Sequence, residues 1–238
     1  MRSLKMTGAV LLSALAMACG GSSAARDTAS TTKPARPPES PAEVVDTVPT
    51  TLDDRRTILF LGTSLTAGLG LDPDSAYPQH IQRKIDASGL PYQVVNAGVS
   101  GETSAGLLRR LDWVLRRPAD VIVIETGAND GLRGLPVDAT RATIGEVLAR
   151  IRQARPDATV LLAQMEAPPN LGQEYTSTFR AMFPGLAREH GATLVPFLLQ
   201  GVAGEARLNQ SDGIHPNNQG ERIVAETVWR ALQPVLTR

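Results

Sequence analysis

Two polar segments carry residue types that serve in nucleophilic catalysis. One lies near the start and the other near the end of residues 55–238. Ser64 lies between Gly62 and Gly68 in the run Gly-Thr-Ser-Leu-Thr-Ala-Gly. Asp212 precedes His215 by three residues in the run Ser-Asp-Gly-Ile-His-Pro. At this spacing a carboxylate can hold one imidazole nitrogen while the other nitrogen accepts a proton from a serine hydroxyl. These residues predict a Ser-His-Asp triad for acyl transfer.

Each of these residues also has a simpler interpretation. A serine beside glycines is often a turn or N-cap residue, and an Asp-Gly pair before a helix is often a surface turn. Because Thr66 stands two positions after Ser64, the segment is not the Gly-x-Ser-x-Gly elbow of α/β-hydrolases. The other two histidines, His80 and His190, lie in segments with helical spacing, and a helix end before Gly191 explains the second. With three histidines, one cysteine and no His-Glu-x-x-His motif, we expect neither a metal nor another cofactor.

Acyl transfer also needs hydrogen-bond donors for the negative charge that develops on the substrate oxygen. The candidates are the backbone N–H groups of Ser64 and Gly101 and the side-chain amide of Asn129. Gly101 could instead be a helix-entry glycine, and Asn129 in Gly-Ala-Asn-Asp-Gly could be a turn former. The combination of three donors with the triad residues favours the catalytic interpretation.

Short apolar runs alternate with longer amphipathic segments. The fold that they form must bring the candidate site residues together. The apolar runs have the near-continuous Val, Ile and Leu content that is typical of strands buried on both faces of a parallel sheet. The expected strands cover residues 57–61, 93–96, 120–125, 159–165 and 193–197, and the expected helices cover residues 76–87, 104–116, 139–154, 175–190 and 218–232. The alternation predicts a doubly wound, three-layer α/β/α sandwich with a five-stranded parallel sheet, and its site should lie at the carboxyl ends of the strands.

The polar loops resemble the motif blocks of the SGNH (GDSL-type) hydrolase family over residues 57–234. Ser64 matches the first block, Gly101 the second, Asn129 the third, and Asp212 with His215 the fifth. The resemblance implies a flavodoxin-like SGNH fold and a Ser-His-Asp esterase with a shallow, open site and no metal.

The resemblance includes one branch of the family and one departure from its signature. Asn96-Ala97, the run 129–134 and Pro196-Phe197 are similar to the bacterial thioesterase, lysophospholipase and arylesterase branch. Thr63 stands where the family signature has Asp, and a threonine hydroxyl can replace one hydrogen bond but not a charge. The motif therefore does not explain how the turn that carries Ser64 is held rigid.

Two further segments are candidates for recognition of the acyl chain. Residues 132–137 and 167–175 follow the third and fourth expected strands and contain apolar side chains, although plain surface loops would have a similar composition.

The first part of the chain has a different composition from the rest. Arg2 and Lys5 precede an apolar run over residues 9–18, which is typical of a secretory signal and too short to span a bilayer. We expect a signal peptide over residues 1–19, with acylation of Cys19 as a lipid anchor to a membrane. The alternative is ordinary cleavage after Ala16-Met17-Ala18.

A spacer separates this signal from the folded part. Residues 20–54 are rich in Ser, Thr and Pro, and they predict a disordered linker because they offer little apolar surface to bury. Residues 55–238 are then the single hydrolase domain.

Composition and charge limit the partners. The chain has 24 Lys plus Arg and 24 Asp plus Glu, so it has no excess of positive charge to bind the phosphate backbone of a nucleic acid. Its aromatic content of 4% argues against a surface on which bases stack. We therefore expect no nucleic acid, and a small-molecule acyl ester as the substrate; the sequence does not fix the oligomeric state.

The leading functional hypothesis is an exported serine esterase that hydrolyses acyl esters or thioesters in the cell envelope. It would be a periplasmic or membrane-anchored lipoprotein, or otherwise a secreted protein. The alternatives are a carbohydrate O-deacetylase of the envelope and a non-catalytic tethered binding module. Apolar side chains in the expected recognition loops argue against the first, and the complete set of catalytic residue types argues against the second.

Overall fold

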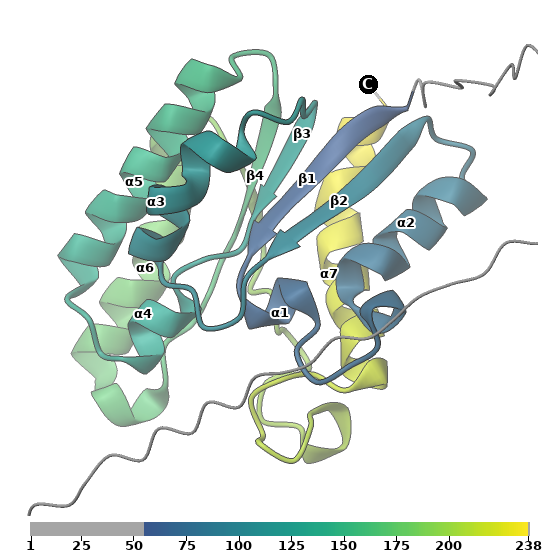
Figure 1. The fold of residues 1–238 in the computed structure, drawn as a ribbon. Coiled ribbons are helices and arrows are strands. Elements are labelled where there is room, and N and C mark those ends of the chain that lie inside the picture. The colour runs from purple at the N-terminus through teal and green to yellow at the C-terminus, as the bar shows by residue number, and fades with distance from the viewer. Residues whose placement is uncertain (1–54, 238) are drawn as a thin grey trace, which may run out of the picture. The chain divides into compact units, whose positions relative to one another are not determined.

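A five-stranded, fully parallel sheet in the order β2-β1-β3-β4-β5 forms the centre of the protein in the computed structural model (Figure 1). The structure describes residues 55–237; the expected signal peptide, Cys19 and linker lie outside this range. The strands are β1 (Arg56–Gly62), β2 (Tyr92–Gly98), β3 (Val121–Ile124), β4 (Thr159–Ala163) and β5 (Thr193–Val195).

Helices cover both faces of the sheet. Helices α2 (Tyr77–Ala87) and α7 (Asn218–Leu236) pack together on one face, and α3 (Ser104–Val114), α5 (Val137–Ala154) and α6 (Gln173–Glu189) follow one another across the other face (Figure 1). This arrangement confirms the predicted three-layer α/β/α sandwich.

The central strands are apolar because both of their faces are covered. All four residues of β3 are buried, and so are the residues of β1 from Ile58 to Gly62. The register pairs Gly62 with Gly98 and Leu61 with Ile124, so β1, β2 and β3 end side by side. The loops that follow these three strands therefore leave the sheet at one edge.

The order of the strands opens a crevice at that edge. From β1 the chain passes through α2 to β2 on one side, and from β2 it returns through α3 on the opposite face to β3 on the other side of β1. At such a reversal the loops after the two central strands diverge, and ligands bind between them.

Several element boundaries differ from the predictions. Two short helices, α1 (Ser64–Ala67) and α4 (Ala128–Leu132), were not expected because four or five residues show no periodicity. Strand β5 ends at Val195 rather than residue 197, since Pro196 has no N–H to donate to a sheet. Helix α6 ends with His190 as its C-cap, as its position before Gly191 predicts.

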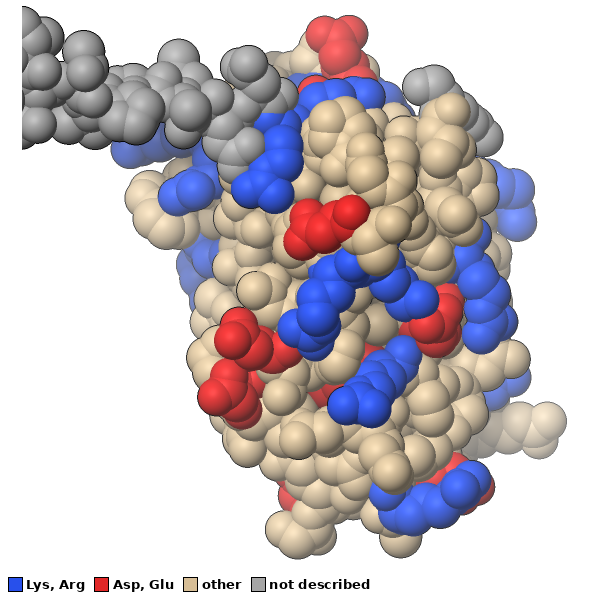
Figure 2. Space-filling model, turned by 90° about the vertical axis from the view of Figure 1, so that its right-hand side faces the viewer, with Lys and Arg blue, Asp and Glu red and all other residues tan. Residues whose placement is uncertain are grey.

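The side of the molecule formed by α2 and α7 carries charges of both signs. Lys and Arg side chains alternate there with Asp and Glu (Figure 2). One of these contacts joins the two helices, because Lys84 Nζ lies 2.5 Å from Glu226 Oε1. No helix within residues 55–237 is long and apolar enough to cross a membrane.

Candidate active site

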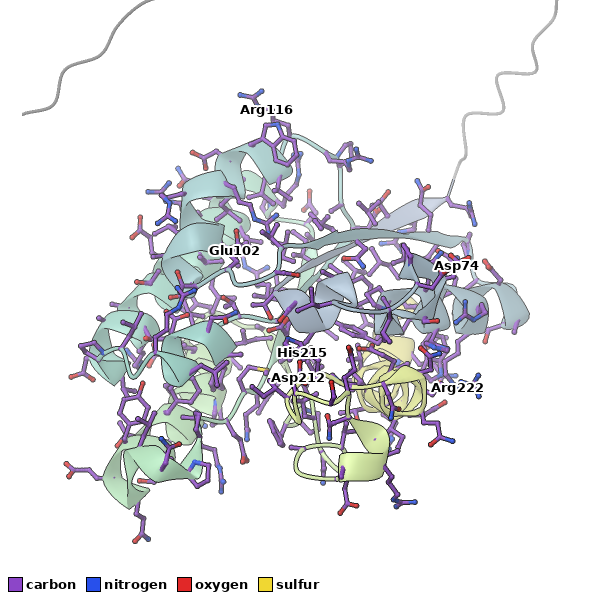
Figure 3. All side chains as sticks on the ribbon, turned by 60° about the horizontal axis from the view of Figure 1, so that its bottom comes forward. Asp74, Glu102, Arg116, Asp212, His215 and Arg222 are labelled. Carbon is purple, nitrogen blue, oxygen red and sulfur yellow. The ribbon has the colours of Figure 1, made fainter. Side chains whose placement is uncertain are left out.

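The structure brings the three predicted triad residues together. Ser64 is the first residue of α1, directly after the turn that ends β1, and His215 lies in the loop before α7. His215 Nε2 lies 2.9 Å from Ser64 Oγ, and His215 Nδ1 lies 2.6 Å from Asp212 Oδ2. Figure 3 shows His215 and Asp212 next to each other at the edge of the sheet that is turned forward. A continuous relay of hydrogen bonds therefore runs from Asp212 to the serine hydroxyl.

The loop of Asp212 is built to orient the imidazole ring. Asp212 Oδ1 accepts the backbone N–H groups of Ile214 at 2.9 Å and His215 at 3.0 Å, while its other oxygen holds the ring. Gly213 between them has φ +70°, a conformation that strains a residue with a side chain. The hydrogen bonds from His215 and Ile214 lower the pKa of Asp212 to about 2. The carboxylate therefore remains ionised at neutral pH and can stabilise a positive imidazolium.

The residues of the three predicted oxyanion donors line one groove together with His215. Gly101 follows β2 with φ +76°, and Asn129 lies in α4 after β3. The Asn129 amide donates one hydrogen to the carbonyl of Glu102 at 3.0 Å. An amide carries two hydrogens, so the second is free to meet a substrate oxygen. Arg133 donates to the carbonyl of Gly101 at 3.0 Å and holds the same loop from α4.

The groove has a volume of about 510 Å³ and mostly apolar walls. Its apolar side chains come from the loops after β1, β3, β4 and β5 and from the His215 loop, and include Leu65, Leu69, Leu132, Met165, Ala167, Pro168, Pro169, Phe197, Leu199 and Ile214. Leu132 and residues 167–169 belong to the segments that the sequence predicted for acyl recognition. The rest of these segments, residues 133–137 and 170–175, does not line the groove.

Residues 60–223 match the GDSL-like Lipase/Acylhydrolase family. The chain belongs to this family. It is 38% identical to esterase TesA of Pseudomonas aeruginosa over 76% of this chain and 90% of that protein. It is 35% identical to thioesterase 1/protease 1/lysophospholipase L1 of Escherichia coli K12 over 76% of this chain and 85% of that protein.

Solved structures give the same result. The psychrotrophic esterase EstA from Pseudoalteromonas sp. matches with a TM-score of 0.72 and 34% identity, over 77% of this chain and all of that chain. These comparisons confirm the family that the motif blocks indicated. The protein is an SGNH-type hydrolase of carboxylic esters, similar to esterases, thioesterases and arylesterases.

The structure also shows how this GDSL-like hydrolase holds its nucleophile turn without the signature Asp. Thr63 donates both its backbone N–H and its hydroxyl to the carboxylate of Glu125, at 2.7 and 2.9 Å. Sequence reasoning placed Glu125 only at the end of the third strand. The signal that could have singled it out is a carboxylate directly after the entirely apolar run Val121–Ile124.

Within residues 55–237, no group of three or more His, Cys, Asp or Glu side chains is arranged to hold a metal ion.

Proposed function

We propose that this hydrolase cleaves aliphatic acyl esters by the serine mechanism, with Ser64 as nucleophile, His215 as general base and acid, and Asp212 as the residue that orients the ring. The observation that carries the proposal is the hydrogen-bonded relay from Asp212 through His215 to Ser64, which opens into an apolar groove.

The geometry of the relay supports the following steps. Ser64 Oγ attacks the carbonyl carbon while its proton passes over 2.9 Å to His215 Nε2. The backbone N–H groups of Ser64 and Gly101 and the free amide hydrogen of Asn129 stabilise the oxyanion. His215 then gives the proton to the departing alcohol or thiol, which leaves an acyl-Ser64 ester. Water, deprotonated by His215, attacks this ester, releases the carboxylic acid and restores the serine.

The apolar walls of the groove support a fatty acyl group as the part of the substrate that binds there. Each methylene buried against such walls contributes about 0.8 kcal/mol. Leu132, Phe197 and Leu199 offer this contact, whereas a sugar would leave hydroxyl groups facing them without hydrogen-bond partners. The groove therefore favours acyl esters over the carbohydrate O-deacetylase alternative, and the intact relay favours catalysis over a binding module. Thioesters share the acyl half, so they belong to the proposed substrate class.

A panel of p-nitrophenyl esters from acetate to palmitate tests this proposal, with acetylated sugars and lysophospholipid as comparison substrates. We expect kcat/KM to rise from acetate to medium-chain esters, and the Ser64→Ala variant to keep less than about 1% of the activity because the nucleophile is absent. Preferred turnover of acetylated sugars would contradict the acyl-ester proposal. Activity in Ser64→Ala above a few per cent would remove Ser64 from its role.

The location of the enzyme forms the second half of the proposal: an exported lipoprotein anchored through Cys19. The pattern of residues 1–19 supports it, and a Pro-rich spacer over residues 20–54 could extend by up to about 100 Å, at about 3.1 Å per residue. Intact-mass analysis of the membrane fraction tests it, with Cys19→Ser as the control that cannot be acylated. A mature chain with an unmodified Cys19, recovered in the soluble periplasmic or secreted fraction, would contradict the anchor and leave the hydrolase proposal untouched.

A further inference from the structure

A buried carboxylate lies directly beneath the nucleophile turn, and the serine mechanism assigns it no role. Glu125 follows β3, and its backbone N–H donates to the carbonyl of Leu61 at 2.8 Å, which extends the pairing of β3 with β1. Its side chain is completely buried. Among residues 55–237 no Lys or Arg forms an ion pair with it. The cost of burying this group must therefore be offset by hydrogen bonds alone.

Three donors converge on this carboxylate. Glu125 Oε2 accepts the backbone N–H of Thr63 at 2.7 Å and the hydroxyl of Thr66 at 2.9 Å, and Oε1 accepts the hydroxyl of Thr63 at 2.9 Å. Because the Thr66 hydroxyl donates to Glu125, it accepts from the Tyr77 hydroxyl, 2.8 Å away. Space here is tight: a Cβ on Gly62 would lie 1.9 Å from Thr66 Oγ1. Both threonines donate to the carboxylate and neither accepts from it, an arrangement that suits its ionised form.

These contacts fix the peptide that carries the nucleophile. Glu125 holds Thr63 through its N–H and its side chain, and the Thr63 carbonyl accepts the N–H of Ala67 at 2.9 Å. Thr63 is thus held on both sides of its Cα, so the plane of the peptide that bears the Ser64 N–H cannot rotate freely. Helix α1 has only four residues and cannot maintain this geometry alone.

We propose that Glu125 is a positioning residue of the hydrolase: through Thr63 and Thr66 its carboxylate sets the direction of the Ser64 N–H and the place of the Ser64 hydroxyl relative to His215. This inference rests on the proposed serine mechanism. Glu125 does not line the groove, so it acts on the reaction only through the turn above it.

The charge of this group is sensitive to pH. Burial raises the pKa of Glu125 to about 7, against the lowering effect of hydrogen bonds from Thr63 and Thr66. The groups that face it are these two neutral threonines from the nucleophile turn, Tyr77 from α2 and Glu221 from α7. Burial raises the pKa of Tyr77 above its ordinary value, so its hydroxyl stays neutral. Glu221 accepts the backbone N–H of Tyr77 at 2.7 Å. A protonated Glu125 must donate a hydrogen, so one of the threonine hydroxyls would have to turn away.

The Glu125→Gln variant tests the proposal because it keeps the shape but replaces one acceptor oxygen by a donor. We expect kcat to fall about 10- to 100-fold with KM changed by less than about 3-fold, since small displacements of a catalytic group act on the reaction step rather than on substrate binding. The rate at which an organophosphonate labels Ser64 should fall by the same factor. Below about pH 7 the protonation of Glu125 should contribute to the decrease of the wild-type kcat/KM, and this contribution should be absent from the variant.

Glu221→Gln is the matched control, because it removes a second buried carboxylate that contacts neither Thr63 nor Thr66. We expect its kcat to stay within about 3-fold of the wild type even where its melting temperature changes. A folded Glu125→Gln protein with wild-type kcat and an unchanged acid limb would overturn the proposal. An equal loss of kcat in both variants would also overturn it, since that result indicates a general effect of buried acids on stability.

A second pair of variants covers the case in which Glu125→Gln does not fold. Thr63→Val keeps the branched shape and removes only the hydroxyl donor, and Thr63→Ser keeps the donor. We expect kcat to fall about 3- to 10-fold in the first variant and to stay near the wild type in the second. Equal kcat values in the two variants would refute the positioning role. If wild-type Ser64 is not labelled by the phosphonate at all, the serine mechanism itself is wrong, which is a separate outcome.

Discussion

Replacement of Asp212 by Asn tests the relay at the residue that sets the ring tautomer. In the wild type the carboxylate accepts the Nδ1 hydrogen of His215, so the lone pair of Nε2 faces the Ser64 hydroxyl. An Asn oxygen can keep the two backbone N–H groups of Ile214 and His215, which leaves its NH₂ group against Nδ1. The ring must then carry its hydrogen on Nε2, where it cannot accept the serine proton.

The structure also sets the expected size of the effect. In a fully buried triad this substitution costs about 10⁴-fold in kcat. The Asp212 side chain is 45% exposed here, so water can replace part of the lost interaction. We therefore expect kcat to fall about 10²- to 10³-fold, which corresponds to about 3–4 kcal/mol of transition-state stabilisation. KM should change little because Asp212 does not line the groove.

Steady-state hydrolysis of a p-nitrophenyl ester at constant pH measures this effect, and circular dichroism monitors the fold. Asp72→Asn is the matched control: Asp72 is an exposed aspartate that accepts a backbone N–H, that of Asp74 at 2.9 Å, outside the relay. We expect its kcat to stay within about 2-fold of the wild type. An Asp212→Asn enzyme that keeps more than about a fifth of the wild-type kcat would refute the tautomer argument.

Three further predictions follow from the same site. Asn129→Ala should lower kcat about 10²- to 10³-fold because the oxyanion loses a donor; in an ester assay, a loss below about 5-fold would mean that the amide only ties the loops together. Burial raises the pKa of Glu125 to about 7 and that of Glu221 to about 8, so the folded state binds more protons than the unfolded state above pH 4.5. The free energy of unfolding should therefore fall as pH rises from about 5 to 8, and Glu221→Gln should reduce this fall in calorimetric scans; a wild-type melting temperature that rises over the same range would contradict the assignment. Leu132→Ser should lower kcat/KM for an octanoyl ester more than for an acetyl ester, because a longer chain in the proposed groove has more methylenes to bury against this wall. Equal losses for both esters would place the acyl chain elsewhere.

The fold was predictable because its signals are local. Five strands buried on both faces appear in the sequence as apolar runs, and the covering helices appear as amphipathic segments. The predictions were wrong for two kinds of element. Helices α1 and α4 are too short to show a helical periodicity in the sequence, and β5 ends early because Pro196 follows it.

The sequence by itself determined which residues could form the relay. Ser64, Asp212 and His215 each belong to a loop that leaves a strand or enters a helix at the active edge, and a parallel sheet gathers such loops at one edge whatever the details of packing. Residue type and position along the chain were therefore enough to select them. The same reasoning selected Gly101 and Asn129.

Only the tertiary structure decided what supports and surrounds these residues. The contact of Thr63 with Glu125 joins positions 62 residues apart and depends on the register of β1 against β3, to which no short motif refers. Phe197 and Leu199 line the groove because the chain after β5 turns toward it, and nothing in their own sequence indicates that direction. Local patterns encode elements and the loops between them, whereas contacts across the sheet depend on how those elements pack. For this reason the triad could be predicted from the sequence, and the contact of the buried carboxylate with the nucleophile turn could not.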